Sequence, residues 1–187
     1  MSHSPHPRRY RVVHAAITAS GELDIESVFR TYYGRLTGLI SRVVRQRARA
    51  EEIAVEVILK WSRSGVAADR TEPWLLRAAA AAAIDELRRR ERRWRRESWF
   101  GFLSKTPATP YEAMAAADEV SRVRAVLAKL APRAAEMLLL RADGASYDEV
   151  AAALEMNAAS VGTTLRRAKE QFRKEYVALY GERTLGG

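Results

Sequence analysis

The feature that most constrains the fold is a pair of short amphipathic patterns in residues 144–174, which one short turn separates. Ser146 precedes Glu149 by the spacing at which a hydroxyl and a carboxylate reciprocally satisfy the free amides of a helix start. Apolar residues then recur at helical intervals and predict one buried stripe: Tyr147, Val150, Ala151 and Leu154. The sequence therefore predicts a short helix that ends at the polar run of residues 155–157.

A second helix is predicted directly after this turn. Asn157 can cap it, and its apolar face comprises Val161, Leu165, Ala168 and Phe172. Rotation of about 100° per residue places another set on the opposite side: Ala159, Thr163, Arg166, Arg167 and Glu170. Two short helices with outward arginines on the second are typical of a helix-turn-helix that enters the DNA major groove. The alternative is a plain helical hairpin with a solvated basic face.

Composition and charge narrow the class of protein. The 187 residues are 48% hydrophobic, which suffices for one compact domain or two small ones. A formal net charge of +9 favours a polyanionic partner, which is nucleic acid or an acidic protein or membrane surface. The chain has no cysteine, which excludes disulfides, thiolate metal sites and thiol catalysis and is compatible with a reducing cytoplasm. No cofactor or metal is expected, and His3, His6 and His14 are interpreted as part of a solvated tail.

The hydrophobic pattern predicts an all-α fold of two small helical domains, because helical spacing recurs and no segment alternates with a period of two. No apolar run is long enough to span a bilayer, and residues 1–21 lack the hydrophobic region of a signal peptide. We therefore expect no membrane insertion and a cytoplasmic location. The expected organisation is a flexible N-terminal extension at 1–22, a first domain at 23–97, a linker at 98–117, a second domain at 118–180 and a tail at 181–187.

The first domain is expected to contain three helices. They are placed at about 24–43, with a kink near Gly34, at 50–62, and at 74–96 after a loop. The third is alanine-rich at first and then almost entirely charged, and the arginines of residues 88–96 cannot all be buried. We interpret this basic half as a polyanion-binding segment, and a solvated helix end is the alternative. Trp99, Phe100 and Phe102 fall in the linker, where they are expected to pack on a neighbouring domain or dock on a partner.

This order of features resembles the extracytoplasmic function (ECF) sigma factors of bacterial RNA polymerase in their two-domain form, over residues 24–176. RAEEIAVEVIL at 49–59 is similar to the family's polymerase-binding helix, D-A-E-D-L-V-Q-E-V-F-L. PWLLR at 73–77, with AIDELRR at 83–89, resembles W-L-x-x-I-A-R-N-L-A-I-D-x-L-R-R. LAPRAAEMLLLR at 130–141 and GASYDEVA at 144–151 resemble L-P-P-R-Q-R-E-V-L-L-L-R and G-L-S-Y-E-E-I-A.

The resemblance implies a sigma factor, which directs core polymerase to promoters and aids DNA melting, with the linker holding the domains apart. Core binding, to the β′ clamp helices and β flap, is expected through Glu51, Glu52, Ile53, Glu56, Val57 and Lys60. The −10 element is expected to contact Trp61, Arg63, Trp74, Arg77, Asp85, Arg88 and Arg89. The −35 element is expected to contact Ser160, Thr163, Thr164, Arg166, Arg167 and Lys169. An anti-sigma factor is a further expected partner.

Several residues differ from the family pattern and keep other functions open: Arg49, Val55, Ala80, Ala81, Glu155, Gly162 and Thr164. One alternative is a sigma-like helix-turn-helix regulator that binds DNA without supporting initiation. Another is a basic helical module that binds an acidic protein or membrane surface. An enzyme is not expected, because the sequence shows no phosphate-binding glycine loop, cysteine nucleophile or metal cluster.

Overall fold

The computed structural model describes residues 24–103 and 119–181, and all regular structure within these ranges is helical. The N-terminal domain comprises α1 (Ile25–Ser41), α2 (Arg47–Ser62), a 3₁₀ turn η1 (Ala68–Arg70) and α3 (Thr71–Leu103). The C-terminal domain comprises α5 (Glu119–Lys129), α6 (Pro132–Ala142), α7 (Tyr147–Ala153) and α8 (Ala158–Tyr180). The predicted all-α fold of two small domains is confirmed. The predicted extension and tail and most of the linker lie outside the described residues.

Asp24 caps the start of α1. The Asp24 carboxylate accepts a hydrogen bond from the Ser27 amide at 2.8 Å, which satisfies a free donor of the first turn and lowers the pKa of Asp24. The helix continues without a break through Gly34. It packs against α2 through fully buried aliphatic side chains: Val28, Leu36, Leu39 and Ile40 from α1, and Ile53, Ala54 and Ile58 from α2.

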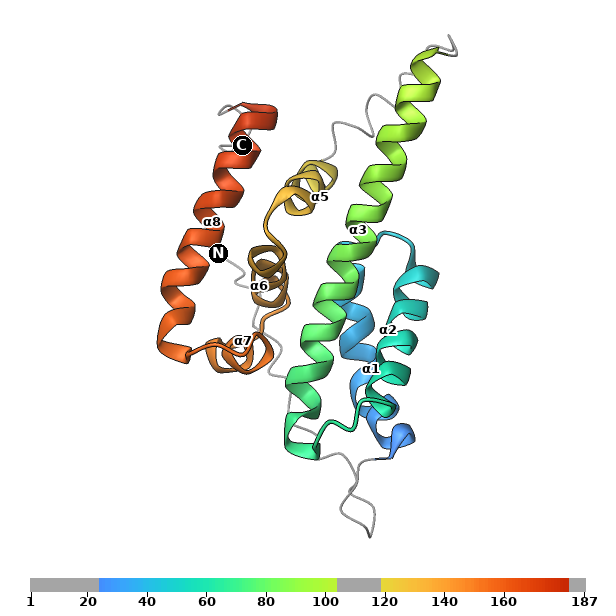
Figure 1. Cartoon of the computed structure of the whole chain (residues 1–187), viewed down its shortest axis with the longest axis vertical. Helices are drawn as coiled ribbons and strands as arrows, with labels where there is room; N and C mark the ends of the chain where they lie inside the picture. The colour runs from blue at the N-terminus through green and yellow to red at the C-terminus, as the bar shows by residue number, and fades with distance from the viewer. Residues whose placement is uncertain (1–23, 104–118, 182–187) are drawn as a thin grey trace, which may run out of the picture.

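The helix α3 is the central element of the molecule and lies between the α1–α2 pair and the C-terminal domain (Figure 1). Ala79, Ala80 and Ala83 are fully buried because small side chains let neighbouring helices approach closely. The helix begins at Thr71 and ends at Leu103, so residues 98–103, which the sequence pattern assigns to the linker, are helical. The side chains of Trp99, Phe100 and Phe102 lie outside the described part of the structure.

The helix-turn-helix forms as the sequence predicts. The Ser146 hydroxyl accepts from the Glu149 amide at 3.1 Å and the Glu149 carboxylate accepts from the Ser146 amide at 2.7 Å. Asn157 caps α8, and Gly144 ends α6 with a φ of 94°, a left-handed conformation that glycine adopts without steric cost. One expectation is wrong: Tyr147 is 46% exposed rather than buried, and its ring lies 5.1 Å from the Arg141 guanidinium. The apolar stripe of α7 therefore begins at Val150.

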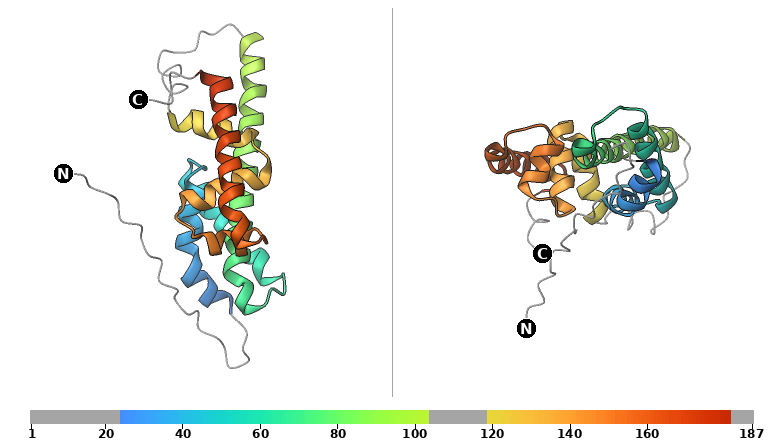
Figure 2. Two further views of the ribbon diagram at one scale, coloured as in Figure 1. Left: turned by 90° about the vertical axis from the view of Figure 1, so that its left-hand side faces the viewer. Right: turned by 90° about the horizontal axis from the view of Figure 1, so that it is seen from below.

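The expectation that the linker holds the two domains apart is also wrong. Helices α5, α6 and α7 all pack on α3, and one continuous hydrophobic core joins the domains. The view from below in Figure 2 shows the same side-by-side arrangement. The physical reason is that the first half of α3 is apolar around most of its circumference, and such a helix is stable only when it is covered on both sides. The α1–α2 pair covers one side and the C-terminal domain covers the other.

Candidate nucleic-acid interface

The exposed face of α8 presents most of the residues predicted to contact DNA. Val161, Leu165 and Ala168 are buried against the rest of the C-terminal domain and fix the rotation of the helix. The opposite face therefore points outward, and its exposed members are Ser160, Thr163, Arg166, Arg167 and Lys169. Thr164 is half-buried, and its hydroxyl donates to the Ser160 carbonyl oxygen at 2.8 Å. The face combines hydroxyl donors with cations, the groups that contact DNA bases and phosphates.

The second basic surface is the distal part of α3, whose exposed arginines are Arg89, Arg92, Arg93 and Arg96. Trp94 lies among them and is 60% exposed, so an aromatic face accompanies the cations. This end of α3 projects beyond α1 and α2 in Figure 1. Cations interleaved with an exposed aromatic ring are typical of surfaces that bind single-stranded nucleic acid.

Arg88 does not belong to this exposed basic surface, because its side chain contacts the C-terminal domain. Its guanidinium donates to the carbonyl oxygens of Ala128 at 3.2 Å and of Leu130 at 2.7 Å. Ala128 lies in the last turn of α5 and Leu130 follows the end of the helix, where carbonyl acceptors lack an intrahelical partner. The structure therefore corrects the predicted DNA-binding role of Arg88, because its donors join the two domains.

Of the other residues predicted to contact the −10 element, some are exposed and some belong to the core or to contacts within the protein. Trp61 is only 6% exposed, and its Nε1 donates to the Thr71 hydroxyl at 3.1 Å, so it belongs to the core and does not present a face for base stacking. Arg63 and Asp85 are exposed, and Trp74 is half-buried. Arg77 is exposed but forms an ion pair with Glu155. Burial of Trp61 could not be predicted from its motif, because a tryptophan at the end of a helix suits either the core or the surface.

On α2, the predicted polymerase-binding residues separate into surface and core. Glu52, Glu56 and Lys60 are exposed and Glu51 is half-exposed. Ile53 and Val57 are buried in the core, which corrects their predicted role in direct contact. Sequence reasoning missed Leu59, which is 40% exposed beside Lys60. The exposed surface of α2 therefore carries an acidic pair, Glu52 and Glu56, together with the cations Arg47 and Lys60 and the apolar Leu59.

Arg49, which stands where the resemblance would place an acid, changes the electrostatics of this acidic surface. Its guanidinium lies 3.1 Å from the carboxylates of both Glu52 and Glu56. It also lies 3.2 Å from Glu86 of α3, which ties α2 to α3. These hydrogen bonds, led by the one to Glu52, raise the pKa of Arg49. Two of the predicted polymerase-binding acids thus share one neutralising cation.

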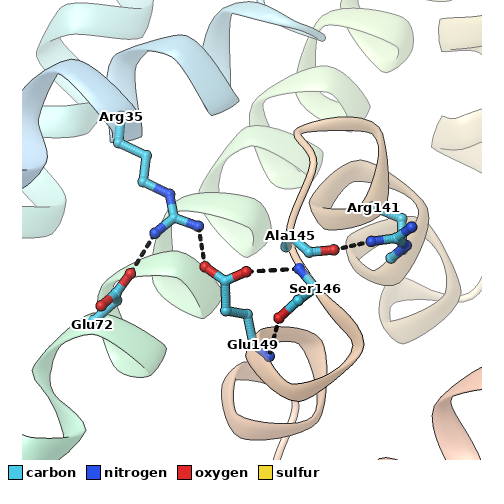
Figure 3. A network of polar contacts seen from close by, with 6 residues as sticks. All are labelled: Arg35, Glu72, Arg141, Ala145, Ser146 and Glu149. Atoms are coloured by element: carbon cyan, nitrogen blue, oxygen red, sulfur yellow. Dashed lines mark hydrogen bonds and ion pairs between the residues drawn. The ribbon is translucent and has the colours of Figure 1, made fainter. Parts of the chain in front are cut away.

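A polar network couples α1 to the cap of the helix-turn-helix (Figure 3). Arg35, whose side chain is only 10% exposed, donates to Glu72 of α3 and, at 2.7 Å, to Glu149 of α7. Burial alone would raise the pKa of Glu149, but hydrogen bonds from the Ser146 amide and from Arg35 outweigh it and lower the pKa. The residue that caps α7 is therefore also a contact between the domains.

A second pair lies near this network. Arg42 Nε donates to the Asp143 carboxylate at 2.9 Å, again from α1 to the C-terminal domain. Here burial has the larger effect, so the pKa of Asp143 is raised even though Arg42 stabilises the charged form. Two arginines of the N-terminal domain, Arg35 and Arg42, thus pair with carboxylates of the C-terminal domain. The domains are therefore joined by ion pairs as well as by apolar packing.

Glu155, in the turn between α7 and α8, makes a further charged contact between the domains. Its φ is 50°, the left-handed region that β-carbon-bearing residues seldom occupy. Its Oε1 lies 3.1 Å from Arg70 and its Oε2 lies 3.1 Å from Arg77. One carboxylate therefore bridges two guanidinium groups, one from η1 and one from α3.

Comparison with known proteins identifies the family. Residues 121–172, which span most of α5 through α8, match the family described as Sigma-70, region 4. The ECF RNA polymerase sigma factor SigK of Mycolicibacterium vanbaalenii is 31% identical over 171 residues, which cover 86% of this chain and 87% of that protein. The chain belongs to the ECF RNA polymerase sigma factors. SigK of Mycobacterium ulcerans is 29% identical over 158 residues, covering 80% and 84% of the two chains.

The match places the helix-turn-helix of this sigma factor within a region that the family shares. ECF sigma factors are transcription factors rather than a class of enzymes.

Within the described ranges, no helix has the length and apolar character needed to cross a membrane. In the same part of the chain, no three side chains of the kinds that ligate metals lie together.

Proposed function

We propose that this sigma factor directs the core enzyme of bacterial RNA polymerase to specific promoters and aids DNA melting, and that it acts in the cytoplasm. The observation that carries the proposal is the capped helix-turn-helix whose second helix exposes a polar and basic face. On that face, Thr163 and Arg166 are the side chains we assign to the −35 element. The names of the relatives, which describe RNA polymerase sigma factors, support the same function.

The basic distal part of α3 is the surface that we assign to the −10 element. Arg89, Arg92 and Arg93 would neutralise phosphates, and Trp94 offers a face on which an unpaired base can stack. Unstacking a base costs about a few kcal/mol, and stacking on a side chain returns about 1 to 3 kcal/mol. These terms are of similar size, so a surface of this composition can stabilise an opened strand.

The exposed face of α2 is the surface that we assign to core polymerase. Glu52 and Glu56 supply negative charge for the β′ clamp helices, and Leu59 supplies apolar area. Charge guides association and orientation, whereas the net strength of such a contact comes mainly from the buried apolar core. The C-terminal domain would contact the β flap, and an anti-sigma factor would bind one or both domains.

The test is transcription in vitro with purified protein and sigma-free core enzyme on a genomic promoter library. We expect core-dependent initiation at a limited set of promoters, and core should retain the protein in a pull-down. Arg166→Ala should reduce initiation about tenfold or more while core binding persists, because one good base contact supplies about 1 to 3 kcal/mol. Absence of core binding would refute the proposal.

Arg30→Ala is the matched control for Arg166→Ala. Both arginines are largely exposed, and each pairs with a glutamate four residues away on its own helix: Arg30 with Glu26 at 2.6 Å and Arg166 with Glu170 at 3.6 Å. The two substitutions remove the same charge, but Arg30 lies on α1, far along the chain from the proposed DNA-binding helix. Equal losses of initiation in both variants would contradict a specific role for Arg166.

A second candidate function is a sigma-like regulator that binds DNA without supporting initiation. Arg49 favours it, because its guanidinium neutralises part of the acidic surface assigned to polymerase. This function predicts retention of duplex DNA together with no core-dependent transcript. The same assay separates the two functions, and Arg49→Gln should then strengthen core binding if charge on α2 limits it.

A further inference from the structure

The exposed face of α2 has an apolar centre. At a rotation of about 100° per residue, Ala48, Val55 and Leu59 fall within about 40° of one another around the helix. Ala48 is exposed, Val55 is half-buried and Leu59 is 40% exposed. The buried side chains of Ala50 and Trp61 lie on the opposite side of the helix and fix this rotation. We call Ala48, Val55 and Leu59 the apolar stripe of α2.

Charged side chains flank the apolar stripe, and their charges are matched on α2 itself. The helix has three acids and three cations, which are Glu51, Glu52 and Glu56, and Arg47, Arg49 and Lys60. On one flank, Arg47 Nε lies 2.8 Å from the Glu51 carboxylate. On the other flank, Arg49 Nη1 lies 3.1 Å from the carboxylates of both Glu52 and Glu56. Every acid of α2 therefore pairs with an arginine of the same helix.

Arg49 is held more firmly than Arg47. Its side chain is 28% exposed, whereas that of Arg47 is 88% exposed. Its third contact, at 3.2 Å, is with Glu86 of α3, whose side chain is only 15% exposed. Water screens such an ion pair less than a fully exposed one, so the guanidinium stays in place beside Glu52 and Glu56. A partner that approaches the apolar stripe therefore meets a nearly neutral surface.

Two departures from the family pattern make this surface less polar. In that pattern, an acid stands at the position of Arg49 and a glutamine at the position of Val55. Arg49 removes one negative charge and supplies a counter-ion for two others. Val55 replaces an amide, which needs hydrogen-bond partners when it is buried, with apolar area. Both changes favour a contact that depends on burial rather than on charge.

We propose that α2 docks on core polymerase through the apolar stripe, and that the partner surface it fits is apolar and poor in charge rather than basic. This inference rests on the proposed function for the identity of the partner. A basic partner gains little from acids that are already paired. An apolar partner leaves the pairs intact and gains from the area that it buries. The residual charge of Glu52 and Glu56 then serves orientation rather than strength.

The first measurement is the affinity of the full chain for sigma-free core enzyme, followed by fluorescence anisotropy. The chain has no cysteine, so Ala178→Cys, at an exposed position near the end of α8, carries a unique label. We expect Arg49→Gln to bind core about threefold more weakly at low salt, because Glu52 and Glu56 lose their counter-ion beside an apolar partner. A basic partner gives the opposite sign, since freed carboxylates attract it. A stronger or an unchanged affinity would overturn the proposal.

Arg30→Gln is the matched control for Arg49→Gln. It removes the same charge from an arginine that pairs with a glutamate, here Glu26 at 2.6 Å on α1. We expect its affinity for core to remain within about twofold of wild type, because an exposed pair outside the contact contributes little. A loss equal to that of Arg49→Gln would assign the effect to net charge alone and contradict docking through the stripe.

Substitutions at Val55 test the apolar stripe without changing any charge. Val55→Gln restores the residue of the family pattern and should weaken core binding about fivefold, because its amide is buried without hydrogen-bond partners. Val55→Ile adds apolar area and should bind at least as tightly as wild type. Equal or tighter binding by Val55→Gln would count against an apolar partner, even if Arg49→Gln proved too unstable to measure.

A cross-linking experiment examines the partner surface directly. Ala48→p-benzoylphenylalanine places a photoreactive ketone on the apolar stripe at an exposed position. After irradiation with core enzyme, mass spectrometry of the cross-linked peptide identifies the segment that the stripe contacts. We expect apolar residues to outnumber lysine and arginine in that segment. A segment in which the cations predominate would overturn the proposal.

Failure of this inference and failure of the proposed function give different results. If the full chain does not bind core enzyme at all, the proposed function fails. If it binds core and initiates transcription, but Arg49→Gln binds more tightly than wild type, the function stands and the apolar docking is overturned.

Discussion

At the scale of single residues, two departures from the family pattern each form ion pairs with more than one partner. Arg49 bridges Glu52, Glu56 and Glu86, and Glu155 bridges two arginines of the N-terminal domain. In both cases the unusual residue carries a charge opposite to that of the surface beside it. Arg49 therefore reduces the free charge of the surface that we assign to core polymerase, and Glu155 neutralises part of the charge of Arg70 and Arg77.

The backbone at Glu155 leads to a prediction about stability. Glu155→Gly and Glu155→Ala both remove the carboxylate, but only glycine adopts the φ of 50° without steric cost. The left-handed conformation costs a residue with a β-carbon about 1 to 2 kcal/mol, and the greater freedom of glycine in the unfolded chain offsets about half of this. We expect the free energy of unfolding of Glu155→Gly to exceed that of Glu155→Ala by about 0.5 to 1 kcal/mol. Urea denaturation of both variants measures it, and a more stable alanine variant would contradict the backbone argument.

At the scale of elements, α3 combines two functions along its length. Its apolar first half is buried between the domains, and its basic second half extends outward with an exposed tryptophan. The change occurs around Arg88, which donates to the C-terminal domain and directly precedes the exposed Arg89. The helix thus links the core of the molecule to the surface that we assign to the opened strand.

This division of α3 predicts which arginines determine the salt dependence of DNA binding. Arg92→Gln with Arg93→Gln should reduce the slope of log affinity against log salt by about 0.7 for each phosphate of single-stranded DNA that the protein no longer neutralises. Arg88→Gln is the control, and it should leave the slope unchanged because its donors bind backbone carbonyls. Anisotropy titrations across a salt series measure the slopes. An equal reduction in all variants would count against the division.

At the scale of the whole molecule, the domains are joined by both apolar and charged contacts. One hydrophobic core extends from Leu36 and Ile58 to Met137 and Val150. Arg35 and Arg42 extend from α1 to carboxylates of the C-terminal domain beside this core. A shared core of this kind makes the domains unfold together, because neither can unfold without exposing apolar surface of the other.

We therefore expect a single calorimetric unfolding transition whose van't Hoff and calorimetric enthalpies agree. Arg35→Gln with Arg42→Gln should lower the stability by about 2 kcal/mol or more within a single transition, because the buried Asp143 and the partly buried Glu149 lose their charged donors while the shared apolar core remains. Arg30→Gln is the control, since its ion pair with Glu26 is exposed and should contribute less than about 0.5 kcal/mol. Two transitions in the wild-type protein would contradict the shared core.

Much of the C-terminal domain could be predicted from local sequence. The caps at Ser146 and Asn157 depend on groups within a few residues, and both form as predicted. The left-handed conformation of Gly144 is likewise a local feature. The exposed face of α8 follows from helical periodicity around Val161 and Leu165. Predictions were wrong where a residue suits two environments, as with Trp61, Ile53 and Val57, whose motif match indicates a partner surface but whose side chains fill the core.

By itself, the sequence determined the helices and their caps, because backbone donors and periodic apolar faces are satisfied within one or two turns. Only the tertiary structure decided which charges meet across the domains. Glu155 lies about eighty residues after Arg70 and Arg77 along the chain, and no local pattern specifies that its carboxylate binds both guanidinium groups. The long-range contact is set by how α3 is covered on its second side, and this depends on the shapes of two complete domains and not on any one segment.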